Sequence, residues 1–238
     1  QSNYVEQHTY DGTTGLRTKT TRSGYAATLY AYDALGQLTR SGLDLDASNT
    51  LVPASNDRIV DTDAYFENWS SAWWLRSDTI GYPTAGSGTP VTLSIARTRL
   101  TGLSGGQTES KVTDAEGNVA STTSTVNRTT KTVTVSTTRT GISGTASQTI
   151  VNGRALSSTG YDGLTTTAEY DAFLRLKKSI DSRNNATTTA YYDNTDLVSS
   201  VTDGAGNAVT TANYDTSGRP IWTRDVANNY TYFEYNTR

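Results

Sequence analysis

The 238-residue chain contains no cysteine and no methionine, and His8 is its one histidine. The absence of cysteine excludes disulfides, thiolate metal sites and cysteine nucleophiles. With one histidine, a histidine-rich metal site is excluded, and a Ser-His-Asp triad would depend on a residue near the N-terminus, where chains fray. No glycine-rich loop has the pattern that holds phosphate between a strand and a helix. We therefore expect a protein that is not an enzyme and that has no cofactor and no bound metal.

Charge and hydropathy argue against two further classes. The formal net charge is −3, with charges of both signs interspersed, so the basic footprint that is typical of nucleic-acid binding is missing. No apolar run approaches the roughly 18 residues of a membrane-spanning helix. We expect no nucleic-acid partner and no membrane span.

The composition favours extended chain and turns. Threonine occurs 45 times, glycine 20 times and tyrosine 15 times. β-Branched and aromatic residues favour strands, and glycine favours turns. No window of a dozen residues shows an apolar period of 3.6. The sequence predicts an all-β fold.

A repeat of about 22 residues is the strongest signal, and it is clearest over 170–238. Evenly spaced Tyr-Asp pairs begin at Tyr170, Tyr192 and Tyr214, and a near copy, Tyr-Asn, begins at Tyr235. An Asp lies near the midpoint between successive tyrosines, and an Asn lies four residues after that Asp. Two earlier tyrosines begin divergent copies. The repeat-defining residues are Tyr10, Tyr32, Tyr170, Tyr192, Tyr214, Tyr235, Asp181, Asp203, Asp225, Asn185, Asn207 and Asn229.

The copy at 192–214 shows what one repeat builds. Residues 197–202 and 208–214 are β-prone runs, and Asp203–Asn207 between them has the composition of a turn. Strand, turn and strand form one β-hairpin. A lone hairpin is marginal in water, so each copy must pack on the next to form a continuous, curled antiparallel sheet. We expect the tyrosine rings to form an aromatic ladder; a row of sugar-stacking rings is the alternative.

These features resemble the YD-repeat (Rhs/teneurin-type) family. The resemblance is carried by the spaced Tyr-Asp pairs, the opening Tyr32–Leu38 and the turn Asp203–Asn207. It covers 170–238 well, 10–43 fairly well and the middle of the chain poorly. It implies a spiral β-sheet, often a hollow shell around a toxin or a cell-surface barrel. Because the chain begins with Gln1 and has no methionine, we expect a processed or excised piece, a fragment or short array of repeats.

Four segments are predicted from the quality of the repeat. Residues 1–50 are divergent N-terminal repeats, and 51–110 are an irregular Trp-containing insertion or long hairpins. Residues 111–169 are degenerate repeats, and 170–238 are regular repeats.

Three of the four tryptophans, Trp69, Trp73 and Trp74, lie in the insertion. Neighbouring residues of a strand point to opposite faces, so at least one of Trp73 and Trp74 is expected to be exposed unless something covers it. An exposed aromatic side chain in an insertion is a candidate contact surface for a glycan or a protein. The alternative is a plug that caps the open end of the sheet.

Two turns invite a specific interpretation. Asp44, Asp46, Ser48 and Asn49 place oxygens close together, as Ca²⁺ sites do, but the usual glycine and closing Glu are missing, so a solvated turn is preferred. Asn152-Gly153 predicts a hairpin with a type I′ turn, since both of its central residues need positive φ.

Four Asn-x-Ser/Thr sequons begin at Asn68, Asn127, Asn185 and Asn229. In a chain so rich in threonine, chance explains most of them, and they do not by themselves predict glycosylation.

We expect a non-enzymatic structural repeat protein, a wall segment of an extracellular or cell-surface YD-type shell or surface protein. Its partners would be neighbouring repeats of a parent protein or other copies of itself. Open sheet edges present unpaired N–H and C=O groups, so assembly into a fibre is a second structural possibility. The rival function is an adhesin that presents the Trp-rich stretch 65–75 to carbohydrate or protein.

Overall fold

The structure is a computed structural model that describes residues 5–83 and 85–236. Residues 1–4, 84 and 237–238 lie outside the described residues, and with them Gln1 and the outer ends of the predicted segments 1–50 and 170–238. Every regular element in the described part of the chain is a β-strand, so the predicted all-β class is confirmed. No helix there is long and apolar enough to cross a bilayer.

The chain divides into two compact units, 1–123 with 139–141, and 124–138 with 142–238. The first unit contains β1 (Glu6–Tyr10), β2 (Arg17–Arg22), β3 (Ala27–Tyr32), β4 (Leu38–Asp44), β5 (Arg58–Trp69), β6 (Ala72–Gly81), β7 (Val91–Arg99) and β8 (Gln107–Asp114). Strands β9 (Val119–Asn127) and β10 (Thr132–Arg139) run across the division. The second unit continues with β11 (Ala146–Val151), β12 (Arg154–Thr159), β13 (Thr165–Tyr170), β14 (Leu176–Ile180), β15 (Ala186–Tyr191), β16 (Val198–Asp203), β17 (Ala208–Tyr214), β18 (Pro220–Asp225) and β19 (Tyr230–Tyr232).

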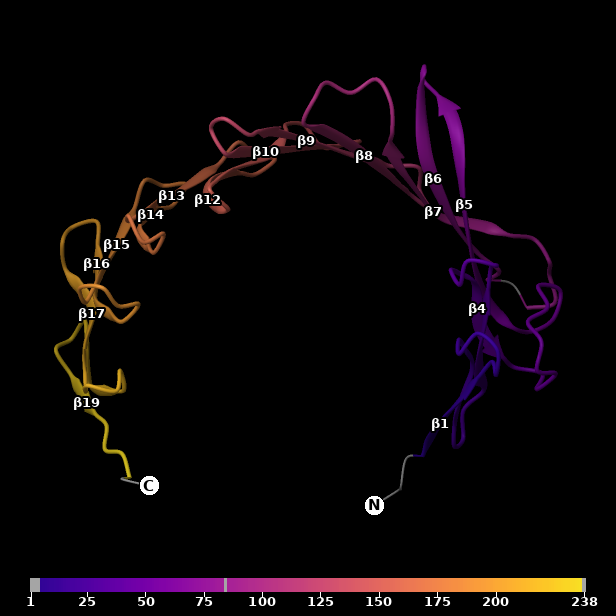
Figure 1. Ribbon diagram of the computed structural model, residues 1–238, viewed down its shortest axis with the longest axis horizontal. Helices are drawn as coiled ribbons and strands as arrows, with labels where there is room; N and C mark the ends of the chain where they lie inside the picture. Colours follow the sequence, from indigo (N-terminus) through magenta and orange to yellow (C-terminus); the bar gives the residue numbers. More distant parts are fainter. Residues whose placement is uncertain (1–4, 84, 237–238) are drawn as a thin grey trace. The chain divides into compact units, whose positions relative to one another are not determined.

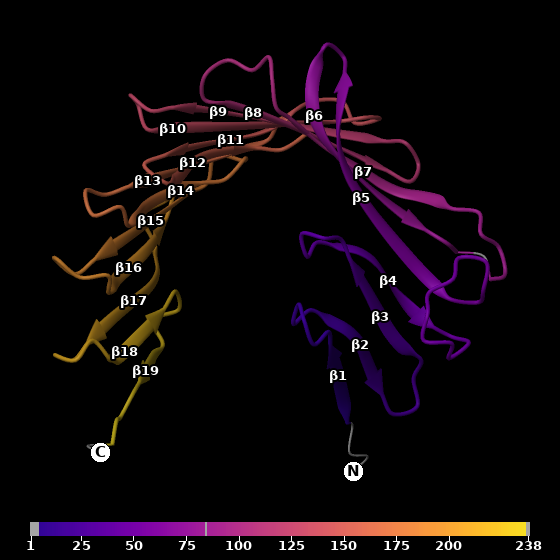
Figure 2. The same cartoon turned by 45° about the vertical axis from the view of Figure 1, so that its right-hand side comes forward.

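Consecutive strands pair in antiparallel fashion, from β1 to β8 in the first unit and from β10 to β19 in the second. The 19 strands of the described residues are assigned to one antiparallel sheet. Within each unit, the strands follow one another in sequence order (Figures 1 and 2). The predicted architecture of successive hairpins is confirmed.

Local sequence explains where the chain turns back. The runs at 197–202 and 208–214 form β16 and β17, as predicted. Asn152 and Gly153 have φ values of 50° and 77°, and they join β11 to β12 in the predicted type I′ turn. Ser70 and Ser71, at 52° and 62°, turn β5 into β6 in the same way without a glycine.

Few side chains are fully buried in this sheet. Among the described residues the buried apolar side chains are Leu29, Ile59, Ala72, Trp74 and Ala212. All but Ala212 lie in the first unit, on β3, β5 and β6. Apolar burial is therefore concentrated around the β5–β6 hairpin, inside the predicted insertion.

The turn at 44–49 is solvated, as preferred from the sequence, except at its first residue. Asp46, Ser48 and Asn49 are exposed, whereas Asp44 is 3% exposed and Asp57, which sequence inspection overlooked, is 2% exposed. Asp44 accepts N–H bonds from Ser48 and Asn49. The loop is wrapped around these two carboxylates because they are the acceptors for its backbone donors.

Candidate functional site

Each regular repeat has two turns, and in one of them an aspartate accepts hydrogen bonds from the turn and from the asparagine four residues later. In Asp203, Oδ1 accepts the backbone N–H of Ala205 and of Asn207, and the Asn207 amide donates to Oδ2 at 3.1 Å. Asp181 and Asp225 make the same bonds with Asn185 and Asn229. In all three, the side-chain amide of the Asn, followed by its backbone N–H, holds the pKa of the aspartate below its ordinary value. The repeated Asp and Asn are turn-closing residues.

The Tyr-Asp turns use the same device with arginine in place of asparagine. Asp171 accepts the N–H of Phe173 and of Arg175, and Arg175 Nε donates to Asp171 Oδ2 at 2.7 Å. Asp215 and Arg219 repeat this arrangement, again at 2.7 Å. The Asp of the Tyr-Asp pair therefore serves the backbone of its own turn and an arginine four residues on.

Tyrosine hydroxyls tie the end of one strand to the start of the strand before it. Each donates to a backbone carbonyl 15 or 16 residues earlier, at 2.9–3.1 Å. The pairs are Tyr32 with Arg17, Tyr170 with Ala155, Tyr191 with Leu176, Tyr214 with Val198, and Tyr235 with Pro220. We call this set the hydroxyl ladder. The strand pairing shifts register just before four of these tyrosines, Tyr32, Tyr170, Tyr191 and Tyr214. Such a shift changes the direction in which the tyrosine side chain points.

Two arginines link these features into a chain of contacts. The Arg175 guanidinium lies 4.4 Å from the centre of the Tyr191 ring while it binds Asp171, and Arg219 lies 4.5 Å from the Tyr235 ring while it binds Asp215. A cation over an aromatic face is attracted by the ring quadrupole. Each turn is thereby coupled to the tyrosine of the following repeat.

Two repeat-defining tyrosines lie outside the hydroxyl ladder. The ladder position in the second regular copy belongs to Tyr191, whereas the Tyr192 hydroxyl donates forward to the carbonyl of Ala212 at 3.0 Å. The turn after it is longer, because Tyr192 N–H bonds Leu197 O, whereas Asp171 N–H bonds Arg175 O. Tyr10 is 57% exposed and lies 6.4 Å from the His8 ring.

Strands β5 and β6 carry the three tryptophans on a hairpin of a different kind. Their register runs without a shift from Trp69↔Ala72 to Val60↔Gly81. Trp74 is 2% exposed, Trp69 40% and Trp73 49%. Because Trp73 and Trp74 are neighbours in a strand, they lie on opposite faces, and the structure separates Trp73 from the other two.

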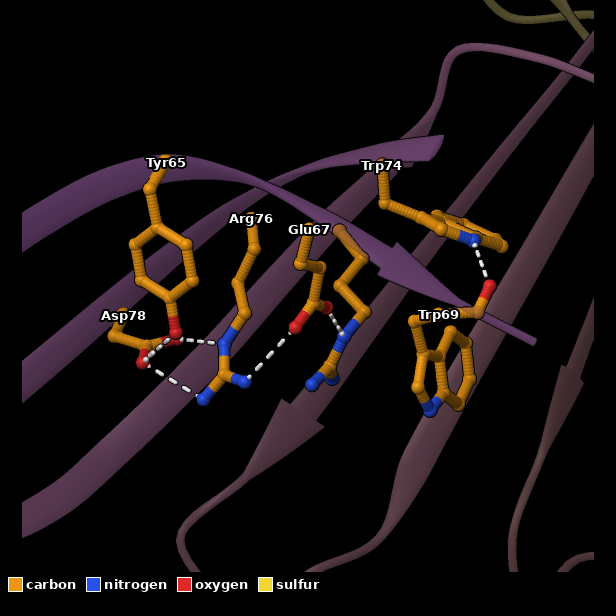
Figure 3. A network of polar contacts seen from close by, with 7 residues as sticks. Tyr65, Glu67, Trp69, Trp74, Arg76 and Asp78 are labelled. Atoms are coloured by element: carbon orange, nitrogen blue, oxygen red, sulfur yellow. Dashed lines mark hydrogen bonds and ion pairs between the residues drawn. The ribbon is translucent and has the colours of Figure 1, made fainter. Parts of the chain in front are cut away.

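The face of β5 and β6 with odd-numbered β5 residues, which we call the networked face, is covered by side chains (Figure 3). Trp69 and Trp74 meet edge to face at 5.4 Å, and Trp74 Nε1 donates to Trp69 O at 2.9 Å. Arg97 lies 4.9 Å from the Trp69 ring, and Lys111 lies within 5.4 Å of both rings. Cations from β7 and β8 therefore cover this tryptophan pair.

Ion pairs extend the network along the same face. Glu67 binds Arg97 at 2.6 Å and Arg76 at 3.1 Å, and Arg76 also binds Asp78 at 2.6 Å (Figure 3). Burial alone would raise the pKa of Glu67, but hydrogen bonds from Arg97 and Arg76 hold it below its ordinary value. The Asp78 bond raises the pKa of Arg76. The charges of Glu67, Arg97, Arg76 and Asp78 thus neutralise one another along this face.

The opposite face of the hairpin, which we call the bare face, is apolar and open. Phe66, paired in register with Leu75, is 68% exposed, and Leu75 is 40% exposed. Trp73, opposite Asn68, is on the same side. Exposed aromatics on an insertion were anticipated; that Phe66 and Leu75 join Trp73 was not, although their alternation along the two strands is visible in the sequence.

Three carboxylates come close enough to hold a cation. Asp44, Asp46 and Asp57 each place an oxygen within 4.8 Å of the others. Asp57 accepts the N–H of Leu45 and of Val52. Burial would raise the pKa of Asp57, but hydrogen bonds from Val52, Ser55 and Leu45 hold it below its ordinary value. Backbone donors thus explain these buried carboxylates without a metal ion.

The sequon residues differ in what their amides do. The side-chain nitrogens of Asn185 and Asn229 donate to Asp181 and Asp225, and a glycan there would remove a turn-closing bond. Asn127 Oδ1 accepts N–H bonds in its turn, and Asn68 lies exposed on β5.

Comparisons with known proteins give a partial result. No family model and no curated protein matches the chain. Among solved structures, 94% of the chain is similar to 12% of a chain in the crystal structure of TcdB2-TccC3-Cdc42, at 13% identity and a TM-score of 0.45. It is also similar to the crystal structure of TcdB2-TccC3 (93% of this chain, 14% of that chain, 12% identity, TM-score 0.41). A third similarity is to the Tc holotoxin pore of Photorhabdus luminescens (93%, 14%, 13% identity, TM-score 0.36). The chain spans 12–14% of the length of these solved chains.

Proposed function

We propose that this chain is a non-enzymatic structural protein, a wall segment of a YD-type shell or surface protein that acts outside the cell or on its surface. The observation that carries the proposal is the hydroxyl ladder. The repeated tyrosine hydroxyls bind backbone carbonyls of the preceding strand, and the repeated Asn and Arg side chains bind the aspartates of their own turns, so these side chains serve to hold the strands and turns together. The lack of oxidisable cysteine and methionine fits an exported protein.

The partners we propose are further repeats of a parent protein or other copies of this chain. The outer edges of β1 and β19 are unpaired among the described strands, and unpaired edges are templates for strand addition. A head-to-tail contact of this kind propagates into a fibre when it does not close.

Particle size separates the two structural roles. Light scattering with negative-stain imaging over a hundredfold concentration range would show growth for a fibre and a constant monomer mass for a wall segment. An enzymatic activity that vanishes when a single Asp or Glu is changed to its amide would overturn both roles.

An adhesin is the second candidate function, and the bare face favours it. Phe66 and Trp73 are exposed on one side of the β5–β6 hairpin, where they could contact a glycan or a protein. A glycan array probed with the chain and with Trp73→Ala tests this. Loss of one glycan signal with an unchanged melting temperature would support the adhesin.

A further inference from the structure

One long stretch of β5 pairs with β6 on one edge and has no described strand along its other edge. The register between β4 and β5 ends at Arg40↔Asp61, whereas the register between β5 and β6 continues to Trp69↔Ala72. Residues 62–69 are thus paired on one side only. Figures 1 and 2 both show the β5–β6 hairpin running past the neighbouring β4 strand. We call this side of 62–69 the open edge.

In a strand, the N–H and C=O groups of successive residues point alternately to the two edges, and this determines which of them the open edge presents. Tyr82 N–H donates to Ile59 O, so the odd-numbered residues of β5 direct their N–H and C=O toward β6. The even-numbered residues direct theirs away from β6. The N–H and C=O groups of Ala64, Phe66 and Asn68 therefore point outward, and no hydrogen bond from any described residue reaches them. These three residues are exposed.

Proteins usually protect such an edge, and this one carries one of the usual devices. The devices are a short strand, charged side chains (above all lysine), a proline or a bulge that twists the edge away, and residues 62–69 have two acidic side chains, Asp63 and Glu67. Residues 62–69 contain no lysine and no proline, and the register of β5 with β6 has no shift. The open edge has no bulge and is eight residues long, a length that suits the addition of one further strand.

The side chains beside the open edge describe the strand that would fit. On the bare face, Phe66 offers apolar surface at the edge itself, and Leu75 continues this surface one strand further in, on β6. On the networked face, Asp63 is exposed and takes part in no ion pair among the described residues, while Asp78 across from it is bound by Arg76. An added strand would bury apolar side chains on one face and would meet an unpaired carboxylate on the other.

We propose that the open edge of β5 is a strand-addition site for an extended segment of a protein partner in which apolar and basic side chains alternate. The backbone of the segment pairs with Ala64, Phe66 and Asn68. Its apolar side chains pack beside Phe66, and a basic side chain meets Asp63. The inference does not depend on the proposed wall role, because it concerns a single hairpin.

A second copy of this chain fits the open edge poorly. Residues 62–69 carry two acidic side chains, Asp63 and Glu67, and no basic one, so no register of two such strands forms an ion pair. When Thr62 lies opposite Asn68, Asp63 faces Glu67 twice, and like charges directly opposite each other destabilise a sheet.

The test uses the full chain and an eight-residue peptide of four Val-Lys repeats, labelled for fluorescence anisotropy. Ala64→Pro removes one outward N–H and no bond to β6, which is where an edge strand tolerates proline. We expect it to weaken peptide binding at least tenfold. Ala64→Val keeps the N–H and should bind within twofold of the parent. Melting temperatures show that both variants remain folded.

Charge gives an independent readout. Asp63→Lys should weaken the Val-Lys peptide at least fivefold and should bind a Val-Glu peptide that the parent chain rejects. Absence of Val-Lys binding at millimolar peptide would overturn the proposal, as would binding that ignores Ala64→Pro. A dimer of the chain alone that Ala64→Pro dissociates would show that the occupant is a second copy, which also overturns it.

Discussion

The β5–β6 hairpin and the hairpins of the regular repeats are stabilised by different means. In β5 and β6, a buried indole is covered by cations from β7 and β8. In the regular repeats, side chains bind backbone groups, and Ala212 is the one buried apolar side chain among the described residues there. A hairpin can thus be held by burial or by directed hydrogen bonds, and the two modes respond differently to mutation.

The largest expected effect is at Trp74. Trp74→Ala should lower the free energy of unfolding by ~3–5 kcal/mol, because it leaves a cavity beneath Arg99 and Lys111. Urea denaturation followed by circular dichroism measures this. The matched control is Trp73→Ala on the bare face, expected within ~0.5 kcal/mol of the parent. Equal losses in both variants would contradict the separation of the two faces.

A smaller loss is expected at the arginine that links one repeat to the next. The Arg175 side chain is 15% exposed and binds Asp171, Thr195 O and the Tyr191 ring. Arg175→Ala should cost about 1–2 kcal/mol, because these bonds involve a charged group. Arg219→Ala removes the same kind of bond from a side chain that is 49% exposed, and should cost at most ~0.5 kcal/mol. Denaturant midpoints of the two variants compare them directly.

The hydroxyl ladder can be tested one oxygen at a time. Tyr170→Phe leaves the Ala155 carbonyl without its donor and should cost about 1 kcal/mol. Tyr161 also belongs to a Tyr-Asp pair, but its hydroxyl makes no hydrogen bond with any described residue, so Tyr161→Phe is expected to be neutral. If the two variants lose equal stability, the tyrosine-to-carbonyl bonds do not hold the strands.

The smallest expected effect is a gradual response to acid. The pKa values of Asp181, Asp203 and Asp225 are held below the ordinary value of 3.8 by bonds from their asparagines. A lowered folded-state pKa stabilises the fold above the unfolded-state value, and this stabilisation is lost as pH falls through the folded-state value. We expect the urea concentration at the unfolding midpoint, measured from pH 5 to pH 2, to decrease once the pH is lower than about 4. Asp203→Asn cannot titrate at this position, so its decline should be shallower.

The sequence predicted most of the repeat, but not which tyrosine of an adjacent pair joins the hydroxyl ladder. Turn chemistry is local, so the Asp203–Asn207 turn and the Asn152-Gly153 hairpin could be read from neighbouring residues. Tyr191 and Tyr192 are adjacent, and only the register shift at Ala190/Tyr191 decides which ring joins the hydroxyl ladder. That shift depends on pairing with the next strand, which the spacing of Tyr-Asp pairs does not reveal.

The tryptophan stretch shows the same limit at longer range. Alternation predicts that Trp73 and Trp74 face opposite ways, but not which of them is buried. Arg97 and Lys111 decide this by covering the networked face, and both belong to later strands, β7 and β8. The burial of Asp57 was missed for a related reason, because its donors, Leu45 and Val52, belong to an irregular loop.

The long turn after Tyr192 has a consequence for how such an array can change. Tyr214 reaches back 16 residues to its carbonyl, whereas Tyr235 again reaches back 15. Two residues are added in this copy, one in the turn after Tyr192 and one between Asp203 and Tyr214, and the next copy resumes both the shorter turn and the 15-residue reach. Errors of length therefore do not accumulate along the array, and the turn at 193–196 is a natural place to graft a foreign loop without rewriting the strands that follow.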